Sequence, residues 1–173
     1  AIDVALKVDN TCLKKVKDLF DIEDIDEIAF VIWTTTPWTI PSNVAVCINP
    51  EYKYSLIKMK NKFCVIAFDM IEECSKRWEQ KLNILSTIHG KKLCDIDLRH
   101  PFLDRKSILL HADHVTTESG TGCVHTAPAH GMDDYLICKK NNIDTVHSIN
   151  NKDFFKDELD FISGLTAMKA EQL

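Results

Sequence analysis

The alternation of apolar and polar residues along the chain predicts many short strands. Residues 2–8 place apolar side chains at every second position, which is the period of a strand buried on one face. Residues 28–33 are apolar throughout and rich in β-branched and aromatic side chains, as in a strand buried on both faces. Further strands are predicted over residues 44–48, 52–60, 63–68, 84–88, 107–111, 123–126 and 145–149.

The helical period appears in fewer segments. Helices are predicted over residues 10–20, 69–82 and 132–140. Asn10 or Thr11 is the expected N-cap of the first, and Asp69 with Glu72 fits a capping box for the second. Many short strands with few helices predict a mixed, β-rich α/β fold, with a β-barrel-like core decorated by helices.

Length and composition fit one globular domain. The chain has 173 residues, of which 45% are hydrophobic and 27% charged. Its longest purely apolar run, residues 28–33, is far shorter than the roughly 20 residues of a membrane span. The first residues lack both an initiator Met and the pattern of a signal peptide. We therefore interpret residues 1–173 as a single domain of a longer protein, to which residues 1–8 and about 160–173 would lead.

Charge and cysteine usage narrow the functional classes. A net charge of −5 argues against a broad nucleic-acid surface but permits a pocket for the end of an RNA. The candidate contacts to RNA phosphates are Lys91, Lys92, Arg99, Arg105 and Lys106. The alternative for each is a place on a solvated surface. The 7 cysteines form no C-x-x-C pair and mostly sit in apolar runs, which indicates a reducing, cytoplasmic setting and no disulfide scaffold.

Two segments carry more polar groups than a scaffold needs. In residues 33–43, three consecutive threonines follow a buried strand, so at least one hydroxyl points inward and requires a partner from the protein or a ligand. In residues 120–135, two histidines and two aspartates lie among glycines that let a ligand approach the backbone. Strand-end capping and a helix N-cap are the structural alternatives for these two segments.

Other chemistries remain open at the second segment. His125 and His130 with Asp133 or Asp134 are possible metal ligands, but Pro128 interrupts any helix between the histidines, and we expect no metal. Ser119, His125 and Asp134 are the residue types of a nucleophilic triad, but the chain has no G-x-S-x-G motif.

Together the two segments resemble the editing domain of class I aminoacyl-tRNA synthetases, specifically of the isoleucyl type. The hallmark stretches W-T-T-T-P-W-T-[LI]-P-[AS]-N and G-T-G-x-V-H-x-A-P-x-H-G-x-D-D-Y stand nearly complete at residues 33–43 and 120–135. Thr36 occupies the position where leucyl and valyl relatives typically carry arginine. The chain departs from the common pattern at Ala129 and Met132. These two departures bear on the conformation of the loop and not on the expected roles of the site residues.

The resemblance implies hydrolytic editing within an isoleucine–tRNA ligase. A hydrophobic pocket distinguishes isoleucine from valine by only about 1–3 kcal/mol, and these enzymes are themselves the standard example of that limit. A second site that excludes isoleucine then removes valine from misacylated tRNA(Ile), and from valyl-adenylate as well. The implied partners are the 3′-terminal adenosine of that tRNA and the rest of a monomeric synthetase. The resemblance implies no membrane and no cofactor in this domain, with ATP and a possible zinc confined to the parent enzyme.

The resemblance also assigns roles. Asp134 is expected to pair with the α-ammonium group of the substrate, and to be kept ionised by the helix dipole and backbone N–H groups. Asn43 is expected to assist the attacking water or the ribose. Thr34, Thr35 and Thr36 are expected to supply hydroxyls to the adenosine, the acyl group and the water. Backbone N–H groups around residues 121–124 are expected to contact the adenine. Further substrate-binding candidates are Trp33, Trp38, Thr121, Gly122, Val124, Thr126, His130 and Asp133.

His125 has two possible roles, a steric wall against isoleucine or a general base, of which we favour the wall. A non-catalytic module that binds the tRNA end is the alternative function for the whole domain. All of these expectations require the segments near residues 35 and 134 to face each other across one small cavity.

Overall fold

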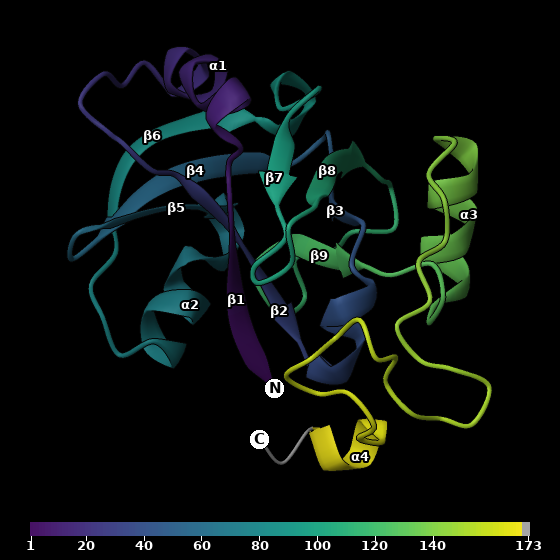
Figure 1. Ribbon diagram of the computed structural model, residues 1–173. Helices are drawn as coiled ribbons and strands as arrows, with labels where there is room; N and C mark the ends of the chain where they lie inside the picture. Colours follow the sequence, from purple (N-terminus) through teal and green to yellow (C-terminus); the bar gives the residue numbers. More distant parts are fainter. Residues whose placement is uncertain (171–173) are drawn as a thin grey trace.

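A computed structural model describes residues 1–170 and contains two β-sheets (Figure 1). The larger sheet has the strand order β1-β2-β5-β4-β6. These strands are β1 (Ile2–Lys7), β2 (Ala29–Thr34), β4 (Lys53–Met59), β5 (Lys62–Ala67) and β6 (Asn83–His89). β1 pairs with β2 antiparallel and β2 with β5 parallel, so β2 lies inside the sheet, as its continuous apolar run predicts.

The smaller sheet has the strand order β7-β8-β3-β9. Its strands are β3 (Ala45–Ile48), β7 (Asp97–Arg99), β8 (Lys106–His111) and β9 (Cys123–Thr126). All four residues of β3 are buried, between β8 in parallel and β9 in antiparallel pairing. β7 has only three residues, too few for an alternation to show, and the sequence did not predict it.

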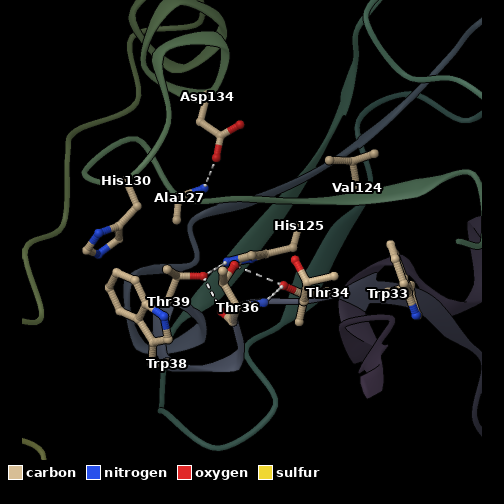
Figure 2. Close-up of a pocket in the computed structure, with 11 residues that line it drawn as sticks. Trp33, Thr34, Thr36, Trp38, Thr39, Val124, His125, Ala127, His130 and Asp134 are labelled. Carbon is tan, nitrogen blue, oxygen red and sulfur yellow. Dashed lines mark hydrogen bonds between the residues drawn. The ribbon is translucent and has the colours of Figure 1, made fainter. Parts of the chain in front are cut away.

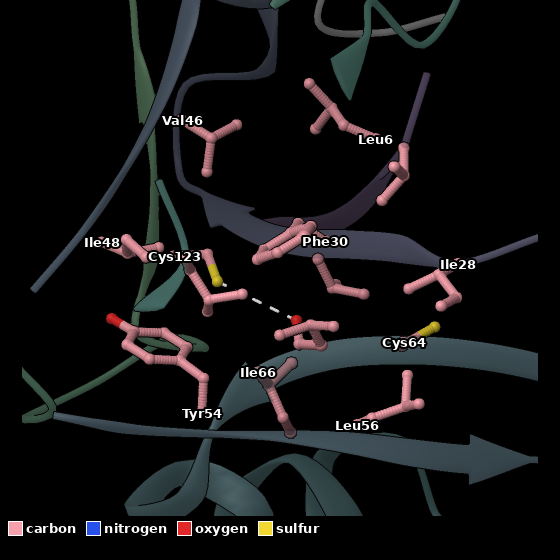
Figure 3. Close-up of a cluster of buried hydrophobic side chains, with 14 of the residues drawn as sticks. Leu6, Ile28, Phe30, Val46, Ile48, Tyr54, Leu56, Cys64, Ile66 and Cys123 are labelled. Carbon is pink, nitrogen blue, oxygen red and sulfur yellow. Dashed lines mark hydrogen bonds between the residues drawn. The ribbon is translucent and has the colours of Figure 1, made fainter. Parts of the chain in front are cut away.

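The two sheets enclose one main hydrophobic core (Figure 3). Phe30, Leu56 and Ile66 from the larger sheet pack with Val46 and Cys123 from the smaller one. A single bridge between Val8 and Leu98 connects edge strands of the two sheets, but no continuous ladder runs around the core within residues 1–170. The predicted mixed, β-rich and barrel-like fold is confirmed, and the two sheets do not join into a closed barrel within the described residues.

Four helices lie around the sheets in the described part of the chain. They are α1 (Asn10–Phe20), α2 (Ile71–Arg77), α3 (Met132–Lys140) and α4 (Ala167–Ala170). Short 3₁₀ turns are η1 (Pro37–Ser42), η2 (Phe68–Met70) and η3 (Gly90–Lys92). The N-cap of α1 is Asp9, whose side chain accepts the Thr11 N–H; the expected cap at Asn10 or Thr11 was wrong by one or two positions.

The second helix is shorter than predicted, and its capping box does not form. α2 begins after the 3₁₀ turn η2, and its N-cap Met70 makes no side-chain cap. It ends at Arg77 because Glu79 takes a left-handed conformation, with φ of 51°, that turns the chain toward β6. The Trp78 indole donates to Asp3 on β1 at 2.8 Å, which fixes this end against the sheet.

Residues 145–149 do not form the predicted strand. Only Ile149 pairs, through one isolated bridge to Phe155, and Ser148 turns its hydroxyl to Ser42 of η1. The following segment has its own small apolar cluster around Phe155, against which Trp38 of η1 packs. The tail of the chain thereby supports the segment that carries the threonine run. Residues 171–173, the end of the segment that was predicted to lead to the rest of a longer protein, lie outside the described residues.

All seven cysteines are free, and five of them are buried. No helix within residues 1–170 is both long and apolar enough to cross a membrane.

Candidate functional site

One cavity of about 310 Å³ lies where the end of β2 and η1 meet β9 and the start of α3 (Figure 2). Its volume is at the lower end of the roughly 300–1,000 Å³ typical of small-molecule sites. It is lined by Trp33, Thr34, Thr35, Thr36, Trp38, Thr39, Val124, His125, Ala127, His130 and Asp134. The prediction that the two polar segments face each other across a single cavity is confirmed.

The threonine run forms one side of this cavity. Thr34 is buried, and its Oγ1 accepts the Thr36 N–H at 3.1 Å and lies 3.3 Å from Thr36 Oγ1. Thr35 and Thr36 are exposed. Pro37 then starts η1, because a proline at the first helical position gives up an N–H that has no helical partner there. The run therefore ends the strand and also leaves two hydroxyl groups accessible from the cavity.

Asp134 enters the cavity from the first turn of α3. Its Oδ2 accepts the backbone N–H of Ala127 at 2.8 Å. A Cβ atom at Gly131, the N-cap, would lie 3.1 Å from the carboxylate, so only glycine leaves this space open. Burial raises the pKa of Asp134, more than the Ala127 N–H lowers it. The Ala127 N–H acts in the expected direction and favours the ionised form, but desolvation by burial is the larger effect on this pKa. That Asp134 is ionised when it meets the substrate stays a prediction.

His125 lies on β9 with both ring nitrogens close to side chains. Nε2 is 2.9 Å from Thr39 Oγ1, and Nδ1 is 2.7 Å from the Asn43 amide nitrogen. Burial lowers the pKa of His125 to about 4, so the ring is neutral at pH 7. The possible triad is not assembled, because Ser119 is exposed outside the cavity lining and neither Ser119 nor Asp134 contacts the His125 ring nitrogens.

Five predicted site residues do not line the cavity. They are Asn43, Thr121, Gly122, Thr126 and Asp133. Asn43 is 1% exposed and lies behind His125, so its side chain does not face a ligand directly. Thr126 is fully buried and donates to the sulfur of Cys47. Asp133 is exposed beside Asp134.

Thr121 and Gly122 connect the two sheets behind the cavity. The Thr121 hydroxyl donates to the Val31 carbonyl on β2 at 2.6 Å, and the Gly122 carbonyl accepts the hydroxyl of Tyr54 at 2.7 Å. Gly122 has φ of 73°, and a Cβ atom there would collide with that of Ala67. These residues therefore hold β9 in place, and neither of them lines the cavity. The expected contact of backbone N–H groups near Thr121 with the adenine stays a prediction.

His130 links the cavity to the tail of the chain. Its Nε2 lies 3.0 Å from Ser42 Oγ, which in turn lies 2.5 Å from Ser148 Oγ. The ring also packs edge-on against Trp38, with centroids 5.0 Å apart. His130 and His125 are thus used in separate networks. Within residues 1–170, no three His, Cys, Asp or Glu side chains are grouped as metal ligands.

Sequence patterns missed two residues of the lining, Thr39 and Ala127. Thr39 follows Thr36 by three positions, and in the 3₁₀ turn its hydroxyl donates to the Thr36 carbonyl at 2.8 Å. The spacing of three residues between Thr36 and Thr39 was therefore the sequence signal that could have identified Thr39. Ala127 contributes a backbone N–H, which side-chain identity does not reveal.

One of the candidate phosphate contacts has a structural role. Arg105 is half-buried, donates to the Asn43 carbonyl at 2.8 Å and to the Pro41 carbonyl, and so holds the end of η1. Arg99 pairs with Asp9, and Lys106 pairs with Asp97. Lys91 and Lys92 are exposed. Arg105 is therefore corrected from a surface candidate to a structural residue.

Comparison with known proteins places this site in a family. Residues 15–170 match the family model described as the leucyl-tRNA synthetase editing domain. An isoleucine–tRNA ligase of Dichelobacter nodosus is 43% identical over 82% of this chain and 16% of its own length. Isoleucine–tRNA ligase 1 of Pseudomonas fluorescens is 39% identical over 99% of this chain and 18% of its own length. The chain thus spans less than a fifth of the length of these relatives.

Solved structures agree on the fold. The P. knowlesi cytosolic leucyl-tRNA synthetase editing domain has a TM-score of 0.63 at 12% identity, covering 82% of this chain and 64% of that one. A structure named GlLeuRS-CP1 has a TM-score of 0.67 at 19% identity, covering 83% of this chain and 65% of that one. The chain therefore belongs to the editing-domain family of the aminoacyl-tRNA synthetases, in its isoleucine–tRNA ligase branch.

Proposed function

We propose that this chain hydrolyses the ester bond between valine and the 3′-terminal adenosine of tRNA(Ile), as the editing activity of a cytoplasmic, monomeric isoleucine–tRNA ligase. Valyl-adenylate is a second proposed substrate of the same cavity. The observation that carries the proposal is the placement of the Asp134 carboxylate opposite the hydroxyls of Thr35 and Thr36 in one small cavity.

Asp134 is suited to hold the α-ammonium group of an aminoacyl ester. One of its oxygens is fixed by the Ala127 N–H, which sets the direction of the carboxylate. Burial raises the pKa of Asp134 more than the Ala127 N–H lowers it, so a cationic partner would offset the remaining cost of desolvating the carboxylate. All aminoacyl esters carry the same ammonium group, so this contact orients the ester without selecting the amino acid.

Hydrolysis requires no covalent nucleophile in this site. Water attacks the ester carbonyl carbon, the bond to the ribose oxygen breaks, and that oxygen takes up a proton as valine leaves. Threonine hydroxyls both donate and accept hydrogen bonds, so Thr35 and Thr36 can orient the water or meet the developing oxyanion. In this proposal Asn43 acts through His125, behind which it lies, and does not contact the water.

Selection of the acyl group falls to the walls of the cavity. His125 from β9 faces the threonine run, and a rigid wall rejects an extra methylene by overpacking. The neutral ring of His125 suits this role better than that of a general base, because its nitrogens already face Thr39 and Asn43. Replacement of His125 by alanine should therefore allow hydrolysis of correctly charged Ile-tRNA(Ile). As a general base, its loss would instead stop hydrolysis of both esters.

Single-turnover deacylation tests the function. Val-tRNA(Ile) is mixed with an excess of this chain, and the fraction of valine released is followed over time, with Asp134→Ala as the control. We expect the wild-type chain to release valine faster than the variant. Equal rates with retained binding of the tRNA would instead support a non-catalytic module that binds the tRNA end.

A further inference from the structure

The tautomer of His125 follows from its neighbours. A neutral imidazole has one N–H donor and one acceptor nitrogen, and its partners decide which is which. Nδ1 faces the side-chain amide nitrogen of Asn43 at 2.7 Å, and Nε2 faces the hydroxyl of Thr39 at 2.9 Å. The direction of the hydrogen bonds around Asn43 and Thr39 therefore determines where the ring proton lies.

Asn43 presents a donor to His125. Its amide nitrogen donates to the carbonyl of Ala45 at 2.8 Å, and a carbonyl only accepts, so the NH₂ end of the amide must point that way. Ser107, a fully buried residue of β8, donates its hydroxyl to the other end of the amide, Oδ1, at 2.6 Å. The second proton of the amide nitrogen is then directed at His125 Nδ1, which accepts it.

Thr39 presents an acceptor on the other side of the ring. Its hydroxyl proton goes to the carbonyl of Thr36 at 2.8 Å, so its oxygen is left to accept Nε2–H from His125 (Figure 2). The donors thus run in one direction, from Ser107 through Asn43, His125 and Thr39 to the Thr36 carbonyl. Each donor in this series is used, and His125 has no nitrogen lone pair left for a water molecule in the cavity.

We propose that Thr39, Asn43 and Ser107 are positioning residues that lock His125 as the neutral, Nε2-protonated tautomer, so that its ring forms a wall of fixed orientation in the cavity. A wall that rotated would change the space available to the acyl group, whereas a ring held at both nitrogens keeps it constant. The part of this inference that concerns acyl selection rests on the proposed function; the part that concerns the tautomer does not.

Nuclear magnetic resonance of this chain with ¹⁵N-labelled histidine tests the tautomer directly. We expect His125 to show a protonated Nε2 and an unprotonated Nδ1 at pH 7. Thr39→Val removes the acceptor of Nε2–H, and Ser107→Ala removes the partner of Asn43 Oδ1, so each should increase the share of the Nδ1-protonated tautomer. Ser55→Ala is the matched control, because Ser55 is also fully buried and bonded, to Thr87 at 2.7 Å, but lies away from His125. A protonated Nδ1 in the wild-type chain, or an unchanged pattern in both network variants, would overturn the proposal.

Deacylation with two charged tRNAs tests the consequence for selection. Under single turnover, Thr39→Val and Ser107→Ala should raise the rate on Ile-tRNA(Ile) relative to Val-tRNA(Ile) by about tenfold, and Ser55→Ala should leave the ratio unchanged. Ser107→Cys, which keeps a weak donor at similar volume, replaces Ser107→Ala if that variant does not fold. An unchanged ratio in the folded network variants would overturn the role in selection. If the wild-type chain hydrolyses neither ester, the proposed function is wrong. The proposed tautomer of His125 is then tested by the magnetic resonance experiment alone.

Discussion

The hydroxyl of Thr121 donates to the backbone carbonyl of Val31 at 2.6 Å, across 90 positions of sequence. Val31 lies in the strand that ends in the threonine run, and Thr121 lies just before the strand that carries His125. The same hydroxyl oxygen lies 3.3 Å from the backbone nitrogen of Cys123, whose N–H it accepts. One buried side chain therefore holds together the two segments that form the cavity.

Replacement of Thr121 by valine is expected to destabilise the fold by about 1–3 kcal/mol. The two side chains have nearly the same shape, so the loss comes from polar backbone groups left without a partner in a buried place. Urea unfolding measures the change, with exposed Thr116→Val as the control. Equal midpoints for the two variants would show that this hydroxyl does not hold the strands together.

Asp134→Asn should weaken binding of an aminoacyl ester by about 10–100-fold, because a hydrogen bond between charged groups becomes one to a neutral amide. The amide oxygen still accepts the Ala127 N–H, so the geometry of the turn is kept. The concentration dependence of single-turnover deacylation separates affinity from rate. Asp133→Asn is the matched control, since Asp133 is the adjacent carboxylate on the same helix and does not line the cavity. A similar loss in both variants would point to net charge instead of a specific contact.

Gly131→Ala should impair deacylation without unfolding the chain. The backbone at Gly131, with φ of −145°, is accessible to alanine, but the new methyl group would lie 3.1 Å from the carboxylate of Asp134. We expect the carboxylate to be displaced and the rate to fall by about tenfold, which corresponds to roughly 1.4 kcal/mol. Circular dichroism verifies the fold and single-turnover kinetics the rate. A wild-type rate for folded Gly131→Ala would mean that the position of Asp134 tolerates this shift.

Acid should destabilise the protein through its buried histidines. Burial lowers the pKa of His100 and of His125 to about 4 each, below the ordinary value of about 6.5. Between these values the unfolded chain binds protons that the folded chain does not, so stability falls as the pH drops from about 6.5 toward 4. Each histidine contributes a loss of about 2 kcal/mol at pH 5.

Urea unfolding at pH 7.5 and pH 5, together with titration of the histidine ring resonances, measures this effect. Both rings should remain neutral in the folded chain at pH 5. A titration midpoint near 6.5 for either ring would contradict the burial that its contacts indicate.

Much of the architecture was accessible from local patterns. The continuous apolar run of β2, the alternation in β1 and the period of α1 each report burial over neighbouring positions, and the structure has these elements within a residue or two of the predicted bounds. The pattern failed where tertiary contacts took over. α2 stops at Arg77 because the chain turns toward β6, and Ser148 belongs to a hydrogen-bonded tail instead of a strand.

By itself, the sequence determined the β-rich fold, the two polar segments and, through them, the family. These features are local runs of residue types, which can be recognised without coordinates. Only the tertiary structure decided that Asn43 stands behind His125, that Arg105 holds the end of η1, and that Thr39 and Ser107 complete the network. The reason is that a hydrogen bond depends on which atoms meet and in which direction they donate. For partners 82 or 64 positions apart, only the folded chain fixes that relationship.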